Sequence, residues 1–122
     1  MMAQVIMVGF QIKSLKIERD KMKLRIFQID AFAENVFCGN PACVVPLKKW
    51  LPKKIMLNIA KENAVAETAF FIESDNHFKL RWFTPEMEMD LCGHATLATA
   101  HAIYSILKLK TKDILFKTRS GN

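Results

Sequence analysis

The sequence predicts a single α+β domain in which short strands form a mixed sheet around an alanine-rich helix. At 122 residues the chain has the size of one domain and is long enough to bury a core. Apolar and polar residues alternate in several short runs, which indicates strands, and two longer segments have helical periodicity. The helix expected from about His94 to Leu107 carries little bulk on several sides, so a sheet could enclose it.

Composition narrows the class of protein. The chain is 51% hydrophobic and 25% charged, which is typical of a globular domain. Its apolar runs stay well short of the about 20 residues that a membrane span needs, so we expect no membrane partner. Its three cysteines are an odd number, and none belongs to a C-x-x-C pair. This favours a reducing compartment over a disulfide scaffold or a zinc ribbon, and we expect a cytoplasmic protein.

The net charge of +6 raises the question of nucleic-acid binding. Lysines cluster at residues 48–54 and 108–112, but no arginine-rich run or aromatic-interleaved stripe accompanies them. Such lysines are usually solvated helix ends, so we expect no nucleic-acid partner. A basic surface can still attract an acidic small molecule.

Residues 1–21 differ from the rest of the chain. Residues 1–10 are apolar but lack the basic start and small-residue cleavage site of a signal peptide, and residues 14–21 are charged without a clear period. We expect Met22 to be the natural start and residues 1–21 to be an upstream extension that the fold can lose. A genuine extra strand or a docking arm is the alternative.

The elements then follow in order. A strand is expected at residues 23–30, and the Gly39-Asn40-Pro41 turn leads to a short strand at 42–45 that Pro46 closes. A helix begins at residues 50–52, with a proline in its first turn, and ends near Asn63. Residues 68–73 and 77–84 form a hairpin, residues 86–90 a short edge strand, and residues 114–116 the start of a further strand.

Two stretches carry residues with possible chemistry. Cys92, Gly93 and His94 place a thiol, an imidazole and the free N–H groups of a helix start within three residues, which suits a carboxylate substrate. Glu67 is a lone acid at the entry to an apolar strand, where lost hydration favours the protonated form of a carboxyl group. The structural alternatives are an ordinary strand–turn–helix with a buried cysteine, and a buried glutamate paired to a distant arginine.

Four stretches occur together in a recognisable order: residues 37–45 (FCGNPACVV), 62–71 (ENAVAETAFF), 81–85 (RWFTP) and 89–100 (MDLCGHATLATA). From Met22 to its last residue the chain resembles the N-terminal half of the PhzF-like isomerases, a phenazine-biosynthesis-like family within the diaminopimelate-epimerase-like superfamily. The resemblance implies that residues 22–122 form an N-terminal domain with a barrel-like curved sheet wrapped around a central helix. Members of the family have two such halves with the active site between them, and we find no second copy in this sequence.

The resemblance also implies roles for single residues. It makes Glu67 the proton shuttle, Gly93 and His94 the binding groups for the substrate and its carboxylate, and Asn40 a residue at the border of the cleft, although a turn former is an equal reading of Asn40. Cys92 is the lesser candidate: related racemases and epimerases use a cysteine at this place as a base, and a thiol at a helix start ionises readily. We expect no cofactor and no metal, because His94 and His101 are two helical turns apart.

The expected function is therefore proton transfer on a small carboxylated metabolite by an isomerase or epimerase that needs a second half or a homodimer for activity. The alternative is a non-catalytic remnant or interaction module with the same fold.

Overall fold

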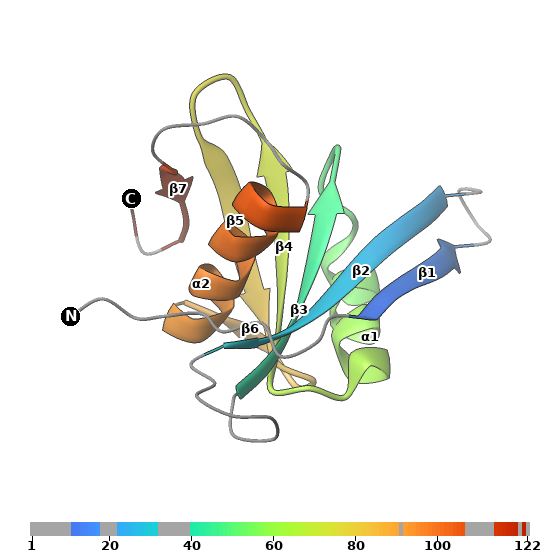
Figure 1. Cartoon of the computed structure of the whole chain (residues 1–122). Coiled ribbons are helices and arrows are strands. Elements are labelled where there is room, and N and C mark those ends of the chain that lie inside the picture. The colour runs from blue at the N-terminus through green and yellow to red at the C-terminus, as the bar shows by residue number, and fades with distance from the viewer. Residues whose placement is uncertain are drawn as a thin grey trace.

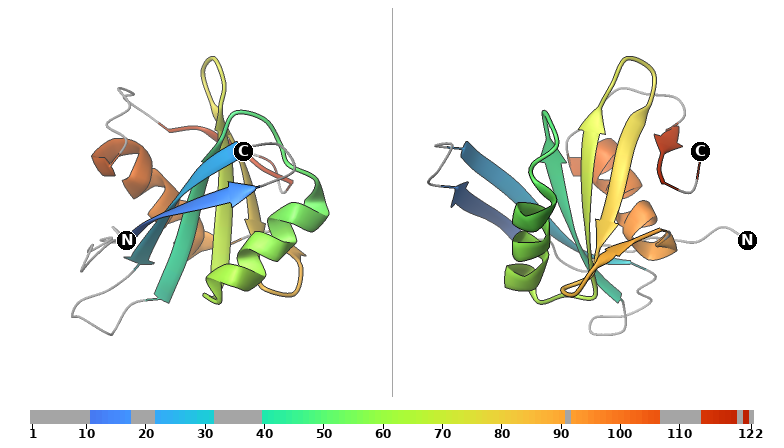
Figure 2. Two further views of the ribbon diagram at one scale, coloured as in Figure 1. Left: turned by 90° about the vertical axis from the view of Figure 1, so that its right-hand side faces the viewer. Right: turned by 180° about the vertical axis from the view of Figure 1, so that it is seen from behind.

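The computed structural model describes residues 11–17, 22–31, 40–90, 92–106, 114–119 and 121. They form one mixed sheet with a helix on each face, as the two further views in Figure 2 show. The elements are labelled in Figure 1. In chain order they are β1 (Gln11–Ile17), β2 (Met22–Ala31), β3 (Asn40–Leu47), α1 (Lys53–Asn63), β4 (Glu67–Glu73), β5 (Phe78–Phe83), β6 (Glu88–Met89), α2 (Gly93–His101), the π-helical turn η2 (Ala102–Ile106) and β7 (Phe116–Lys117).

The strand order is β1-β2-β3-β4-β5-β6, and β7 also pairs with β5. The β3–β4 and β5–β7 pairs are parallel and the others antiparallel. The α+β class and the mixed sheet expected from the sequence are therefore present. Within the described part of the chain the sheet is open, with β1 at one edge and β6 and β7 at the other, so the expected barrel-like closure is not seen there.

Each face of the sheet has its own apolar core, because successive side chains of a strand point to opposite faces. Ala69, Phe71 and Trp82 lie on the face covered by α2, which we call the α2 face. Phe70 and Phe83 lie on the opposite α1 face, where their rings meet edge to face at 5.4 Å. The buried residues of α2, Ala95, Ala98 and Thr99, continuing to Ala102 of η2, are spaced to form one helical stripe against the sheet.

The two helices follow their sequence signals. Pro52 precedes the first residue of α1, and Ala64 ends that helix in the left-handed conformation with φ of 53°. The helix expected at 94–107 is α2 with its continuation η2, a change to π-helical winding that periodicity does not reveal.

β3 is longer than the strand expected at residues 42–45, and both Pro41 and Pro46 lie inside it. Pairing of β3 with β4 begins only at Ala42, so Pro41 is paired with β2 alone. Pairing of β3 with β2 extends only to Val44, so Pro46 is paired with β4 alone. Each proline therefore lies where β3 has one paired neighbour, so its missing N–H is tolerated. Pro46 does not close the strand, and Asn40, expected in a turn, is the first residue of β3 and lies opposite Ala31.

The segment before Met22 contains a strand that the main expectation did not include. β1 pairs with β2 from Gln11 opposite Gln28 to Ile17 opposite Met22. A genuine extra strand was the alternative for this segment, and pairing along the whole of β1 argues against the idea that residues 11–17 can be removed without effect.

Candidate functional site

Three candidate positions lie at one end of the sheet. Asn40 opens β3, Glu67 opens β4 and Gly93 opens α2. β3 and β4 run parallel, with Ala42 opposite Glu67. Figure 1 shows the first turn of α2 at the same end as the starts of these two strands.

Glu67 lies on the α2 face of the sheet. The alternation along β4 places it on the same side as Ala69 and Phe71, and its neighbour Ala42 belongs to the same core. The side chain is partly buried, and its Oε2 atom is shielded from solvent. The next residue, Thr68, points to the α1 face, where its hydroxyl accepts a hydrogen bond of 3.1 Å from the Asn63 side chain.

Cys92 immediately precedes α2 in an extended conformation, with φ of −150° and ψ of 102°. The residue is buried and belongs to the core of the α2 face. Its carbonyl oxygen accepts two hydrogen bonds from Thr96, one from the backbone N–H at 3.2 Å and one from the hydroxyl at 2.7 Å. Thr96 thus fixes the geometry of the helix start.

A third hydrogen bond of Thr96 ties this helix start to the sheet. The indole Nε1–H of Trp82 donates to the Thr96 hydroxyl over 3.0 Å. Trp82 lies opposite Ala69 in the β4–β5 register, and Ala69 is two residues beyond Glu67. This chain of contacts places the first turn of α2 beside the beginning of β4, so the structure brings the Glu67 and Cys92 positions to one region of the α2 face.

The other candidates are placed by backbone only. Gly93 and His94 are the first two residues of α2, and Asn40 is the first of β3. The side chains of His94 and Asn40 lie outside the described part of the structure. A helix start carries N–H groups without intrahelical partners and a partial positive charge, which suits a carboxylate or phosphate. A carboxyl group beside such a start can exchange a proton with a bound anionic molecule.

Metal ligands do not come together among the described residues, where no group of three or more His, Cys, Asp or Glu side chains could hold an ion. In the described helices, none is long and apolar enough to cross a membrane. His101 lies at the end of α2, and burial lowers the pKa of its imidazole, so it is neutral near pH 7.

Sequence reasoning missed a charged cluster around Glu88. The Glu88 side chain is only 3% exposed and accepts two hydrogen bonds from Arg81, Nε to Oε2 at 2.7 Å and Nη2 to Oε1 at 2.8 Å. Arg119 Nη1 lies 3.4 Å and Lys53 Nζ 3.9 Å from Oε1. Hydrogen bonding to Arg81 lowers the pKa of Glu88 against the opposing effect of desolvation, and the same hydrogen bond raises the pKa of Arg81.

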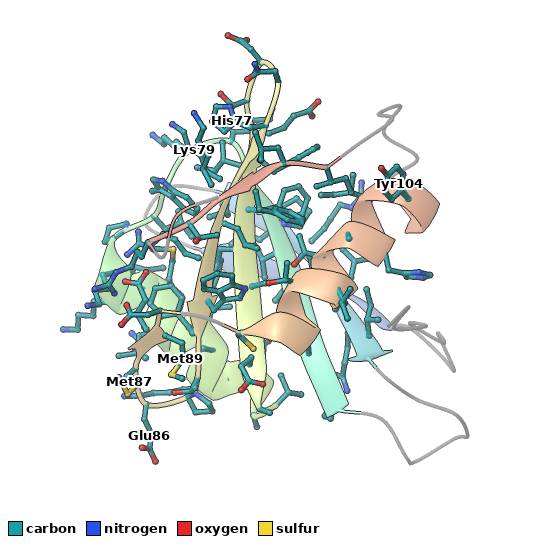
Figure 3. The ribbon with its side chains drawn as sticks, turned by 90° about the vertical axis from the view of Figure 1, so that its left-hand side faces the viewer. His77, Lys79, Glu86, Met87, Met89 and Tyr104 are labelled. Atoms are coloured by element: carbon teal, nitrogen blue, oxygen red, sulfur yellow. The ribbon has the colours of Figure 1, made fainter. Side chains whose placement is uncertain are left out.

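The signal for this cluster was an acidic residue in a short edge strand with an arginine seven positions earlier on the neighbouring strand. The sequence offers Glu88 many other basic partners, so the pair could not be chosen by inspection. The β5–β6 hairpin that carries this pair turns at the end of the sheet where β3 and β4 begin. Figure 3 shows Glu86 and Met87 of its turn at the opposite end of the sheet from His77 and Lys79.

Comparisons with known proteins give matches over most of the chain. Residues 29–122 match the family described as phenazine biosynthesis-like protein. An uncharacterized isomerase of Pseudomonas aeruginosa is 52% identical over 100 residues, which cover 82% of this chain and 39% of that protein.

Solved structures show the same fold. A PhzF family protein of Enterococcus faecalis superposes with a TM-score of 0.78 at 50% identity, covering 82% of this chain and 38% of that one. A predicted epimerase of Pseudomonas aeruginosa superposes with a TM-score of 0.63 at 29% identity, covering 68% and 30%. The chain thus spans between 30% and 39% of the length of these relatives, and it belongs to the phenazine biosynthesis-like (PhzC-PhzF) family.

Proposed function

We propose that this chain is one lobe of a cofactor-independent isomerase that moves a proton on a small carboxylated metabolite. The observation that carries the proposal is the place of Glu67, on the α2 face beside the first turn of α2. A carboxyl group there can take a proton from carbon and return it, while the helix start neutralises the carboxylate of the substrate. Family membership supports isomerase chemistry for the longer relatives.

Glu67 is the acid–base residue in this proposal, and Gly93, His94 and Asn40 are binding residues. Cys92 is the second candidate base because it immediately precedes α2 and belongs to the same core. We favour Glu67 because Cys92 is 8% exposed and packs among Ala95 and Ala98, which limits access to its sulfur. We propose that the reaction takes place in the cytoplasm, because an odd number of cysteines without a C-x-x-C pair suits a reducing compartment.

A second lobe completes the site in this proposal. The relatives are more than twice the length over which this chain matches them, so their sites can draw on residues that have no counterpart here. The second lobe can be further chain or a second copy of this one in a homodimer, and the sheet would then wrap more fully around α2. Analytical ultracentrifugation tests the homodimer: we expect a dimer at high protein concentration, and a clean monomer contradicts it.

The alternative is a non-catalytic remnant that keeps the fold as an interaction module. Solvent-exchange measurements separate the two. The chain, alone and mixed with the separately produced second lobe of a full-length relative, is incubated in D2O with 2-amino acids and with carboxylates that carry a conjugated diene. Loss of a carbon-bound proton signal by NMR supports the isomerase. No exchange under any of these conditions supports the remnant.

The matched control uses the other end of the same strand. Glu67→Gln keeps the size of the side chain and removes its titration, and we expect exchange to fall by about 10², the usual scale of general acid–base catalysis. Glu73→Gln changes an exposed glutamate at the far end of β4 and should leave the rate unchanged. Equal rates for wild type and Glu67→Gln would exclude Glu67 as the shuttle.

A further inference from the structure

Arg81 and Trp82 are neighbours on β5, and their side chains point to opposite faces of the sheet. We propose that these two residues are positioning residues, which hold residues 88–90 and 92–96, called the segment below, at their two ends and so fix the start of α2 relative to Glu67. The proposal rests on the proposed function only for the importance of that segment. The two contacts that carry it are independent of each other.

The first contact anchors the beginning of the segment. β6 has only two residues, whose register places Glu88 opposite Phe83 and Met89 opposite Trp82. So short a strand has little stability from its ladder alone. The paired hydrogen bonds from Arg81 to the buried Glu88 carboxylate, at 2.7 and 2.8 Å, supply a rigid fork in its place.

Aromatic rings hold the guanidinium itself in place. Arg81 lies over the Trp50 ring at 5.2 Å and over the Phe83 ring at 5.5 Å, measured from its central carbon to the ring centroids. A planar guanidinium can stack on a ring and bind both carboxylate oxygens at once, whereas an ammonium group cannot. Replacing Arg81 by lysine therefore keeps the charge but removes the geometry.

The second contact anchors the end of the segment. Trp82 donates its indole N–H to the Thr96 hydroxyl, and that hydroxyl donates to the Cys92 carbonyl oxygen. Trp82 is 2% exposed, so its ring is fixed by the core. One hydroxyl therefore joins a rigid side chain of the sheet to the residue that precedes α2. Thr99 offers a contrast, because its buried hydroxyl bonds to the Ala95 carbonyl within the helix at 2.7 Å.

Hydrogen–deuterium exchange followed by mass spectrometry tests the proposal on the chain as it is. In Thr96→Val and in Arg81→Lys, we expect the amides of residues 96–98, the first in α2 with acceptors in the preceding turn, to exchange about tenfold faster, as when one hydrogen bond of a locally opening segment is lost. Amides of β3 and β4 should exchange as in wild type. Thr96→Ser keeps the hydroxyl and should restore wild-type exchange.

Two matched controls separate positioning from general destabilisation. Thr99→Val also removes a helix hydroxyl, but one that makes no bond to the sheet. Arg25→Lys removes another arginine that lies over a ring, that of Phe27 at 5.1 Å, at a site on β2 away from the segment. We expect neither to change exchange at residues 96–98 by more than about twofold, within the usual small effect of such substitutions.

Unchanged exchange at residues 96–98 in both Thr96→Val and Arg81→Lys would overturn the proposal, as would a uniform increase over the whole sheet. Because this readout requires no turnover, it can fail while Glu67 remains the shuttle, or succeed in a protein without activity. Where proton exchange on a substrate is detected, Thr96→Val should raise KM more than it lowers kcat, since it disturbs binding geometry and leaves Glu67 in place.

Discussion

The charge of Glu88 should contribute measurably to stability, and Glu88→Gln tests this. The substitution keeps the volume and one oxygen acceptor but removes a charge that is bound by Arg81 at two points and approached by Arg119 and Lys53. Hydrogen bonds to charged groups contribute roughly 1.5–3 kcal/mol, so we expect a loss of about 2 kcal/mol at pH 7. For a chain of this size that corresponds to a fall in Tm of roughly 8 °C.

The pH dependence gives the sharper test. Because Arg81 lowers the pKa of Glu88 in the folded state, the unfolded chain binds more protons between the two pKa values, and stability rises with pH there. The contribution is complete above the unfolded value of about 4.3 and disappears as the pH falls through the folded value. The difference in Tm between wild type and Glu88→Gln should therefore be large at pH 7 and shrink towards pH 2.

Thermal unfolding followed by circular dichroism measures both values. Glu86→Gln is the control, since Glu86 is exposed on the turn that leads into β6, and it should change Tm little at any pH. If Glu88→Gln lowers Tm as much at pH 2 as at pH 7, the loss of stability comes from the changed shape of the side chain and not from its lost charge. Absence of any loss at pH 7 would refute the stabilising role of the ion pair.

The remaining predictions concern the sheet and its core. Deleting residues 1–17 should expose the edge of β2 that β1 covers and lower the solubility of the protein. Deleting residues 1–10 keeps β1 and should leave solubility and Tm near those of the full chain. Equal solubility and Tm for the two deletions would show that β1 is dispensable. Leu80→Ala, at 1% exposure, should cost about 2–5 kcal/mol in a denaturant titration, while Leu115→Ala, at 43% exposure, should cost under about 0.5; similar losses would contradict the assignment of the core.

The elements that local pattern determines were predicted well. The alternation in β5 and the spacing of apolar residues in α1 identify a strand and a helix without tertiary information. The start of α2 at Gly93 and the edge position of β6 follow from the same kind of signal. These segments have a period that one buried face imposes on the sequence.

What local pattern could not supply depends on partners distant along the chain. β1 has Lys13, Ser14 and Lys16 among its apolar residues, and it forms a strand because β2 pairs with it. Pro46 looks like the end of a strand, yet β3 continues through it since only β4 is paired there. Arg81 binds Glu88 because the β5–β6 hairpin brings the two side chains together. The sequence alone does not rank this ion pair above the other possible pairs of basic and acidic residues.

In the candidate site, too, some residues could be identified from their neighbours in sequence and others could not. Glu67 and Cys92 were singled out from their neighbours in sequence, and the structure brings their positions to one region of the α2 face. Thr96, which ties the helix start to Trp82, resembles any other helical threonine in the sequence. The roles of Glu67, Cys92, Gly93, His94 and Asn40 in binding and catalysis stay predictions.

The most direct test of the central claim compares Glu67→Gln with Cys92→Ser. Both variants, alone and with a complementing second lobe, are assayed for transfer of solvent deuterium to a substrate that the wild type exchanges. We predict that Glu67→Gln lowers the exchange rate by about 10² or more and that Cys92→Ser lowers it much less. Full exchange by Glu67→Gln together with its loss in Cys92→Ser would contradict the role of Glu67 as the proton shuttle and assign the chemistry to the thiol.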